Sequence, residues 1–505
     1  MGIIQRQPAT AADKTYDIII IGGGVYGVML SFEASRRGLK SLLLEKDDFG
    51  GATTFNFLRI LHGGFRYLQT FDFPRFRESV AERRWFMKTF PDLVKPLPCL
   101  MPLYGNGLRR TSILRIATWI NNALSYKRNQ DVPPEKHLPA GKIMDVEQTQ
   151  RLFPSVDTHE LQGAVVWYDA AVLSSERLVM EILRWACGHG ATALNYVEAI
   201  KLLKNDNKVF GIEATDLESG QTYTYRSEVV VNTTGPWCRN VASCFDKDES
   251  SLFRSSLAWN VLFDRDAISS HALAVTPRKP KGRTYFLLPW KGKLLAGTGH
   301  APWSQGIDNP IPSPEMIQDF LSDLNMAVPS LGLKQKEIFY VFAGLLPAAK
   351  PGTTDLADRE VILKHADHDG PKGFYSISGV KFTTARLVAE KALKQIFPQK
   401  KAKKNIWDEK PSASKNADDR HGILNFEWHN RGLSHQEEQE WRKGIRLIAE
   451  EESVRHLDDL VFRRTSLWDN PKRVLETGPL ICELLHLDKS EWNEEIERLK
   501  RKLHR

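Results

Sequence analysis

The stretch Tyr16-Asp-Ile-Ile-Ile-Ile-Gly-Gly-Gly-Val-Tyr-Gly27 decides the fold, together with Leu42-Leu-Leu-Glu45, whose acid lies eighteen residues after Gly27. The pattern predicts a buried strand, a glycine turn, a helix and a second strand that ends in an acid. Gly22 allows the tight turn, Gly24 lets the backbone approach a pyrophosphate, and Gly27 lets the helix lie close to the strand. The helix N-terminus offers N–H groups to phosphates, and Glu45 can accept hydrogen bonds from a ribose. The unit therefore predicts a dinucleotide site, with a merely structural glycine turn as the alternative.

Length and charge place the chain among enzyme-sized proteins. Its 505 residues are enough for two or three domains. The 70 Lys and Arg residues exceed the 62 Asp and Glu residues, which gives a net charge of +8. This excess is spread along the chain, so it indicates a solvated surface first and an anionic substrate or membrane surface second. No segment resembles a nucleic-acid-binding module, and we expect no nucleic-acid partner.

The cysteines indicate a reducing compartment. No CxxC pair and no metal-ligand spacing with histidine occurs among Cys99, Cys187, Cys238, Cys244 and Cys482, so we expect reduced thiols and no metal site. Residues 1–14 contain no apolar segment typical of a leader, and no apolar run is long enough to span a bilayer. We therefore expect a cytoplasmic protein, and any membrane contact would be peripheral, on the inner face.

The nucleotide-binding domain is predicted to be interrupted. A strand over 193–203, a hairpin over 209–225 and a buried strand over 227–232 form a second group of features, and a strand and turn over 373–384 lead into a helix over 385–396. Strand-rich blocks at 257–264 and 284–298 lie between these pieces and predict an antiparallel sheet over a pocket. An interrupted domain of this kind favours FAD over NAD, because simple nicotinamide dehydrogenases usually keep the domain contiguous.

Six motifs, in order along the chain, resemble those of the FAD-dependent glycerol-3-phosphate dehydrogenase family, a group of D-amino-acid-oxidase-like FAD oxidoreductases. The motifs are Ile21-Gly-Gly-Gly24, Leu61-His-Gly-Gly-Phe-Arg-Tyr-Leu68, Asn232-Thr-Thr-Gly-Pro-Trp237, Leu288-Pro-Trp290 with Gly297-Thr298, Gly379-Val-Lys-Phe-Thr-Thr384, and Val454-Arg-His-Leu-Asp-Asp-Leu-Val-Phe-Arg-Arg-Thr465. The resemblance covers almost the entire chain.

The resemblance implies an α/β protein with an interrupted Rossmann-like FAD-binding domain, an antiparallel-sheet substrate domain and a C-terminal helical cap. We divide residues 16–400 into FAD-binding pieces (about 16–75, 160–240 and 340–400) and substrate-domain pieces (about 76–159 and 241–339). A linker is expected over 401–420, followed by a helical domain over 421–505 with helices at 434–451, 454–462, 471–485 and 490–503.

The resemblance also implies the site residues. Lys381 would stabilise the negative charge of a reduced flavin, Arg66 and Tyr67 would lie in the substrate site, and Arg359 would meet the anionic end of the substrate. For Arg359, a solvated salt bridge is an equal alternative. The residues expected to bind FAD are Gly22, Gly24, Gly27, Glu45, Thr53, His62, Gly63, Val197, Gly235, Gly379 and Lys381.

The substrate half departs from the family pattern. Without a gap in the alignment, Leu345 stands where the family has a substrate-binding arginine, Trp259 where it has a histidine near the substrate, and His300 where it has an aspartate. In the segment before His62, residues 55–58 replace family serines and Arg59 replaces a lysine. Two of these changes remove groups that bind an anion or move a proton, so the substrate pocket is predicted to have diverged.

The sequence therefore predicts an FAD-dependent enzyme that oxidises a CH–OH group by hydride transfer to FAD N5, with glycerol 3-phosphate as the family substrate. The same fold acting on another hydroxy or amino compound is one alternative, and a flavin-binding protein without turnover is another. We expect an anionic small-molecule substrate, while quinone, oxygen and protein all stay open as electron acceptors. The basic amphipathic segment 108–128 is either a membrane-surface helix or a surface helix with one buried stripe.

Overall fold

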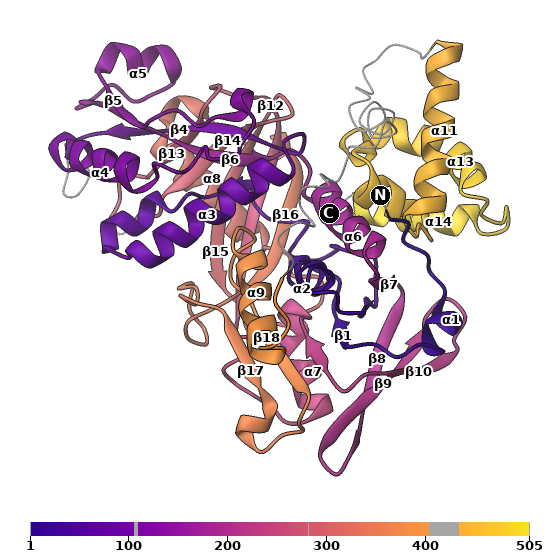
Figure 1. Ribbon diagram of the computed structural model, residues 1–505. Helices are drawn as coiled ribbons and strands as arrows, with labels where there is room; N and C mark the ends of the chain where they lie inside the picture. Colours follow the sequence, from indigo (N-terminus) through magenta and orange to yellow (C-terminus); the bar gives the residue numbers. More distant parts are fainter. Residues whose placement is uncertain (1, 106–109, 281, 403–433, 504–505) are drawn as a thin grey trace.

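The computed structural model describes residues 2–105, 110–280, 282–402 and 434–503 (Figure 1). The first unit forms as predicted: β1 (Ile18–Ile21) and β2 (Ser41–Leu44) pair in parallel and are joined by α2 (Val25–Ser35). All four isoleucines of β1 are buried, as expected for a parallel strand covered on both faces. A Cβ at Gly27 would lie 1.9 Å from the Gly22 carbonyl oxygen, so this glycine is required by the close helix–strand packing.

The nucleotide-binding sheet is assembled from distant segments. Its order is β17 (Val361–Lys364), β18 (Phe374–Ser378), β11 (Val230–Asn232), β1, β2 and β7 (Thr192–Leu194), and only the β17–β18 pair is antiparallel. The prediction of an interrupted domain is therefore confirmed. The strand expected over 193–203 is in fact two strands, because the chain turns at Tyr196, which has a φ of 54°.

After that turn, the chain enters a separate three-stranded sheet. Its strands β8 (Val197–Asn205), β9 (Lys208–Asp216) and β10 (Thr222–Arg226) include the predicted hairpin. The two sides of β1 face different layers. Ile18 and Ile20 pack with α2, α6 (Ser175–Gly188) and α9 (Ala385–Ile396), whereas Ile19 and Ile21 pack with the three-stranded sheet. The short α1 (Pro8–Ala12) and α7 (Cys238–Phe245) lie in this second layer.

A nine-stranded sheet forms the other half of the molecule. Its order is β16 (Ile338–Pro347), β12 (Ser255–Asp266), β15 (Lys293–Pro302), β14 (Tyr285–Trp290), β13 (Ala272–Val275), β4 (Val94–Leu103), β6 (Gly163–Val172) and β3 (Ile60–Leu61), with β5 (Lys142–Met144) also paired to β6. Neighbours are antiparallel except β13 and β4. The sequence-based boundaries place β3, β6 and β16 in FAD-binding pieces. The structure places them in the large sheet, because they form its ladders with β4, β6 and β12.

Helices surround this large sheet. The apolar cluster beneath β12 and β15 includes α8 (Pro314–Ala327) and adjoins α5 (Val146–Leu152). The 3-10 helix η1 (Phe65–Thr70) packs with α3 (Phe73–Thr89) and α4 (Thr111–Leu124). Helix α4 falls within the predicted amphipathic segment, of which residues 108 and 109 lie outside the described part. None of the helices in the described ranges is long and apolar enough to cross a bilayer.

The C-terminal part is helical, as predicted. It consists of α11 (His435–Glu451), α12 (Leu457–Asp459), the π-helical turn η9 (Leu460–Arg464), α13 (Pro471–Leu484) and α14 (Trp492–Leu503). Ser434 begins α11 with a capping box, in which its hydroxyl accepts from the Glu437 amide. The predicted linker over 401–420 lies largely in residues 403–433, outside the described residues.

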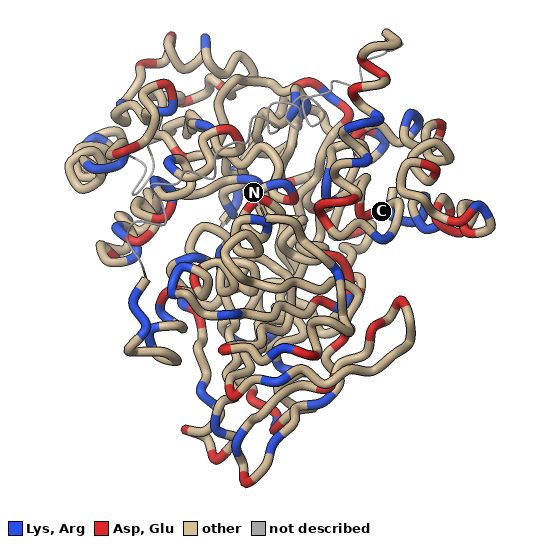
Figure 2. The backbone as a smooth tube through the Cα atoms, turned by 45° about the vertical axis from the view of Figure 1, so that its right-hand side comes forward, with Lys and Arg blue, Asp and Glu red and all other residues tan. Residues whose placement is uncertain are grey.

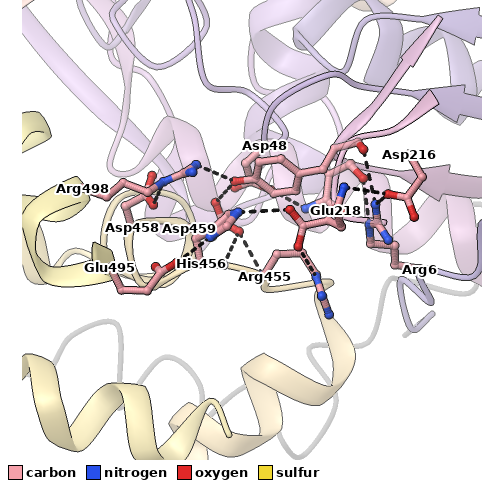
Figure 3. A network of polar contacts seen from close by, with 12 residues as sticks. Arg6, Asp48, Asp216, Glu218, Arg455, His456, Asp458, Asp459, Glu495 and Arg498 are labelled. Atoms are coloured by element: carbon pink, nitrogen blue, oxygen red, sulfur yellow. Dashed lines mark hydrogen bonds and ion pairs between the residues drawn. The ribbon is translucent and has the colours of Figure 1, made fainter. Parts of the chain in front are cut away.

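Charged side chains join this cap to the nucleotide-binding half (Figure 3). Arg464, which is fully buried, donates through both terminal nitrogens to Asp48, just after β2. His456 lies 3.3 Å from a Glu218 oxygen and 2.7 Å from a Glu495 oxygen. Elsewhere, acidic and basic residues are interspersed over the backbone (Figure 2), so the net charge does not collect on one long basic element.

Candidate active site

A cavity of about 2730 Å³ runs between the six-stranded nucleotide-binding sheet and the nine-stranded sheet. It begins at the carboxyl ends of β1, β2 and β11, where ligands bind in open parallel sheets. From there it reaches strands β12, β14 and β15 of the nine-stranded sheet. The predicted site residues on its wall are Gly22, Gly24, Glu45, Thr53, His62, Arg66, Tyr67, Val197, Gly235, Gly379 and Lys381.

The end of the cavity near β1 has the form of a dinucleotide cradle. Gly22 has a φ of 101°, in the region that favours glycine, and Gly24 stands at the N-terminus of α2. A Cβ at Gly24 would meet only the Thr54 hydroxyl, 3.4 Å away, so the space next to this backbone belongs to the cavity. No acidic residue occupies the first turn of α2, which leaves its positive end available to phosphate.

Glu45 lines this end of the cavity. Its carboxylate accepts hydrogen bonds from the Gly23 amide (2.6 Å) and the Asp47 amide (2.9 Å). Burial raises the pKa of Glu45 to about 7, against the opposing effect of the backbone donors. Because a carboxylate has about four acceptor positions, these two bonds leave room for ribose hydroxyls. The cradle and this acid fit the adenosine diphosphate half of FAD.

At the other end, Asp169 on β6 organises the segment around His62. Its carboxylate accepts from the Gly63 amide (2.6 Å) and from Arg83 (2.9 Å), and one oxygen lies 3.1 Å from His62 Nδ1. Burial raises the pKa of Asp169, but these partners outweigh it and hold the pKa at about 2. Sequence reasoning missed Asp169, since a lone aspartate in an apolar strand has no motif around it.

Gly63 does not line the cavity. A Cβ there would lie 1.9 Å from the Arg83 guanidinium, so this glycine is needed for packing against the buried Arg83. Its neighbour Gly64 lines the cavity and has a φ of 85°. Close approach of the backbone to a ligand is therefore available at Gly64 and His62.

Lys381 is held at the junction of the two halves. The Tyr26 hydroxyl accepts from the Lys381 amide (3.0 Å) and donates to its carbonyl (2.8 Å). The Tyr26 ring fits only because residue 379 is glycine, where a Cβ would lie 1.8 Å from the ring. Burial and the nearby Arg66 lower the pKa of Lys381 to about 8, so the ammonium form predominates at neutral pH.

A group of cationic side chains meets in this part of the cavity. The Lys381 ammonium lies 4.4 Å from the centre of the Tyr67 ring. Arg66 acts electrostatically on both Lys381 and His300, and Arg283, just before β14, also acts on His300. Arg283 donates to the Thr354 hydroxyl. Sequence reasoning missed Arg283, although an arginine directly before a cavity-lining strand could have suggested it.

Arg359 does not line the large cavity. Its side chain is exposed and borders a small neighbouring pocket that also touches Tyr67 and Lys381. The nearby carboxylates are Asp72 and Glu360, whose pKa values it helps to lower. The structure thus places Arg359 at the rim, outside the wall of the large cavity.

Of the three departures in the substrate half, His300 and Leu345 border the cavity, whereas Trp259 does not; the side chains of Trp259 and Leu345 are both buried. Trp259 is buried on the opposite face of β12, with its ring 6.1 Å from that of Phe320 on α8. Leu345 is buried in the same apolar cluster, and its carbonyl accepts from Thr53. The resemblance implied a position near the substrate for Trp259, but the structure places Trp259 in the core, because alternation along β12 turns Ala258 and Asn260 toward the cavity instead.

Comparison with known proteins agrees with this architecture. The model of the FAD-dependent oxidoreductase family matches residues 17–394. A glycerol-3-phosphate dehydrogenase of Synechocystis sp. is 31% identical over 398 residues, which cover 76% of this chain and 70% of that protein. The mitochondrial glycerol-3-phosphate dehydrogenase of Saccharomyces cerevisiae is 28% identical over 427 residues, which cover 76% of this chain but only 64% of that protein.

A solved structure extends the likeness over the whole fold. The glycerol-3-phosphate dehydrogenase of Bacillus halodurans, complexed with FAD, superposes with a TM-score of 0.72 at 20% identity and covers 98% of this chain and 96% of its own. The chain therefore belongs to the FAD-dependent oxidoreductases and, among them, to the glycerol-3-phosphate dehydrogenase family. It is an FAD-dependent enzyme, and the cradle described above fits that cofactor.

Proposed function

We propose that this enzyme oxidises the secondary hydroxyl of glycerol 3-phosphate or of a closely similar phosphorylated hydroxy compound. The observation that carries the proposal is the convergence of Arg66, Arg283 and Lys381 on one part of the cavity wall. Cationic groups on one part of a wall repel one another, and an anion bound among them would offset this repulsion. Guanidinium groups bind phosphate in a bidentate way, so they can replace the arginine that is missing at Leu345.

The roles of the chain's own residues follow from their positions. Arg66 and Arg283 would bind the phosphate, and Tyr67 would hold the Lys381 ammonium in place through its ring. Lys381, at the segment that leads into α9, would place positive charge where the reduced cofactor becomes negative. When bound, FAD supplies a hydride acceptor at N5. Arg359 at the rim would attract anions rather than hold the substrate.

Anaerobic reduction of the bound flavin tests this proposal. Glycerol 3-phosphate should reduce it, and glycerol at equal concentration should do so far more weakly. Arg283→Leu should weaken glycerol 3-phosphate binding by about ten- to a hundredfold, since a hydrogen bond to a charged group contributes about 1.5 to 3 kcal/mol. Faster reduction by an amino compound or by a neutral alcohol would favour a different substrate. No reduction by any of them would favour a flavin protein without turnover.

The electron acceptor is proposed to be a membrane quinone, reached through peripheral contact of α4 with the inner face of a membrane. Ile116 and Trp119 on this helix are 62% and 71% exposed, while Ile120 and Leu124 pack against η1. Arg115 stands among the exposed apolar residues. An exposed apolar face with basic residues is typical of helices that lie in a headgroup layer. In Figure 1, α4 lies at the periphery, away from the C-terminal cap.

Co-sedimentation with vesicles of phosphatidylglycerol and phosphatidylcholine tests this contact. The double change Ile116→Glu with Trp119→Glu should reduce the bound fraction at least about fivefold, because charge is disfavoured in the apolar layer. Phe210→Glu is the matched control, since Phe210 is an exposed apolar residue on β9. Equal binding of both variants, or no binding of the unmodified protein, would contradict the contact.

A further inference from the structure

His300 is a cavity-lining residue with a buried ring nitrogen that has no partner within the described residues. It lies on β15 opposite Ala258 of β12, and it lines the cavity. Its Nδ1 is buried and has no hydrogen-bond partner within the described part of the chain. A buried polar atom without a hydrogen-bond partner is energetically unfavourable. When such an atom lines a cavity, a bound ligand can supply the missing partner.

Other polar side chains on the cavity wall, Asn260 and Asp169, already form hydrogen bonds. The Asn260 amide oxygen accepts from the Thr298 hydroxyl (3.0 Å), and its amide nitrogen donates to the Asn56 carbonyl (2.8 Å). The Asp169 carboxylate already accepts hydrogen bonds from Gly63, Arg83 and Trp167. Lys381 is mainly an ammonium group at neutral pH, which has no lone pair to accept a proton.

The charges around His300 keep its ring neutral. Burial, Arg283 and Arg66 together lower the pKa of His300 to about 4. At pH 7 the imidazole therefore has a free lone pair. An anionic substrate between these guanidinium groups would offset their effect and make the ring a stronger base when the substrate is bound.

We propose that His300 is the general base of this enzyme, which accepts the proton of the substrate hydroxyl. The O–H bond of the substrate breaks and its proton moves to the imidazole. The C–H hydrogen leaves as hydride, with its electron pair, to the oxidised flavin, and the carbon and oxygen form a C=O bond. The inference rests on the proposed function. His300 lies on β15. The family pattern has its histidine at the position of Trp259, on the neighbouring strand β12, but Trp259 faces the core in this chain.

His62 is the competing candidate. It also lines the cavity, and its Nδ1 lies 3.1 Å from an Asp169 oxygen, which would hold the orientation of the ring. The two histidines are distinguished by removing each ring separately.

Rapid-mixing measurement of flavin reduction by glycerol 3-phosphate tests the proposal in the FAD-loaded protein. His300→Ala should lower the limiting reduction rate about a hundredfold while the dissociation constant of glycerol 3-phosphate changes less than about threefold. Added imidazole should restore part of the rate, because it can enter the space of the missing ring. His300→Gln serves if the alanine variant folds poorly, and His159→Gln is the control for an exposed histidine outside the cavity.

A limiting rate within about threefold of the unmodified enzyme would overturn the proposal, as would a loss confined to the dissociation constant. A large loss in His62→Gln with none in His300→Ala would assign the base to His62.

If glycerol 3-phosphate does not reduce the unmodified protein, the proposed substrate fails, and a second readout decides on His300. Its pKa, measured by NMR of ¹⁵N-labelled histidine without substrate, should lie well below 6.5 and rise when inorganic phosphate is added. A pKa above 7 would exclude a neutral base.

Discussion

At the scale of single residues, the backbone of Lys381 is fixed by Tyr26, and its ammonium group lies over the Tyr67 ring. Lys381→Met should leave FAD bound and slow flavin reduction by at least about tenfold, which corresponds to about 1.4 kcal/mol of lost charge stabilisation. With a pKa of about 8, the ammonium is lost as pH rises through 8, so the rate in the unmodified enzyme should fall across that range. Lys381→Arg should retain its rate there. Rapid-mixing absorbance from pH 6 to 9.5 measures both, and unchanged kinetics in Lys381→Met would make Lys381 structural.

The glycines of the first turn offer a second residue-scale prediction, because they differ in what surrounds them. Gly24→Val should fold but fail to bind FAD, since its side chain meets only Thr54 and projects into the cradle. Gly27→Ala should instead unfold the domain, as its methyl group would overlap the Gly22 carbonyl. Circular dichroism and FAD absorbance separate the outcomes. Retention of FAD by a folded Gly24→Val protein would show that the pyrophosphate lies elsewhere.

Residues with a local pattern could be predicted from the sequence, and residues placed by tertiary contacts could not. The glycine turn and Glu45 follow from spacing alone, and both lie in the cradle. Trp259 was misplaced because a sequence motif does not show which face of a strand a side chain occupies; that face is fixed by the register of β12 in the sheet, which turns Trp259 toward α8. Arg283 and Asp169 belong to no short motif, so only the fold brings them to the cavity.

At the scale of elements, the contact between α12 and the three-stranded sheet depends on the charge of His456. Burial lowers the pKa of His456, but hydrogen bonds to Glu218 and Glu495 outweigh it and raise the pKa to about 10. A pKa raised above the unfolded value of about 6.5 stabilises the fold fully below pH 6.5, and this contribution is lost as pH rises through 10. His456→Gln should therefore lower the free energy of unfolding by about 1.5 to 3 kcal/mol at pH 6 and by much less at pH 10.

Urea denaturation at the two pH values measures this difference, with His159→Gln as a control for an exposed histidine. An equal loss at pH 6 and pH 10 would mean that His456 acts through packing rather than charge.

At the scale of the whole molecule, element types were more predictable than the division into domains. The helices of the cap and the interrupted nucleotide-binding sheet follow from periodicity and turn residues. The sequence does not show that β6 and β16 belong to the nine-stranded sheet, because pairing between strands that are distant in sequence leaves no local pattern. The same reason explains why the sequence did not indicate that the cap reaches the cavity, which Phe462, Arg463 and Arg498 line.

We expect the C-terminal cap to influence FAD binding through the buried ion pair of Arg464 and Asp48. Asp48 lies near Glu45 at the adenosine end of the cavity, and Arg464 is its bidentate partner from η9. Arg464→Met should lower stability by about 3 to 5 kcal/mol, because it leaves the Asp48 carboxylate buried without its cation, with Asn195 still donating to one oxygen. It should also weaken FAD binding, since the loop that carries Asp48 also adjoins the ribose site.

The double change Arg464→Met with Asp48→Leu is the matched control, because it removes both charges together. It should recover most of the stability while the cap stays docked. Calorimetric melting with and without FAD, together with the FAD dissociation constant, measures both effects. If Arg464→Met lowers the melting temperature but leaves the FAD dissociation constant unchanged, the cap stabilises the fold without shaping the cofactor site. If the double variant regains stability and FAD affinity together, docking of the cap and binding of the cofactor are one coupled equilibrium.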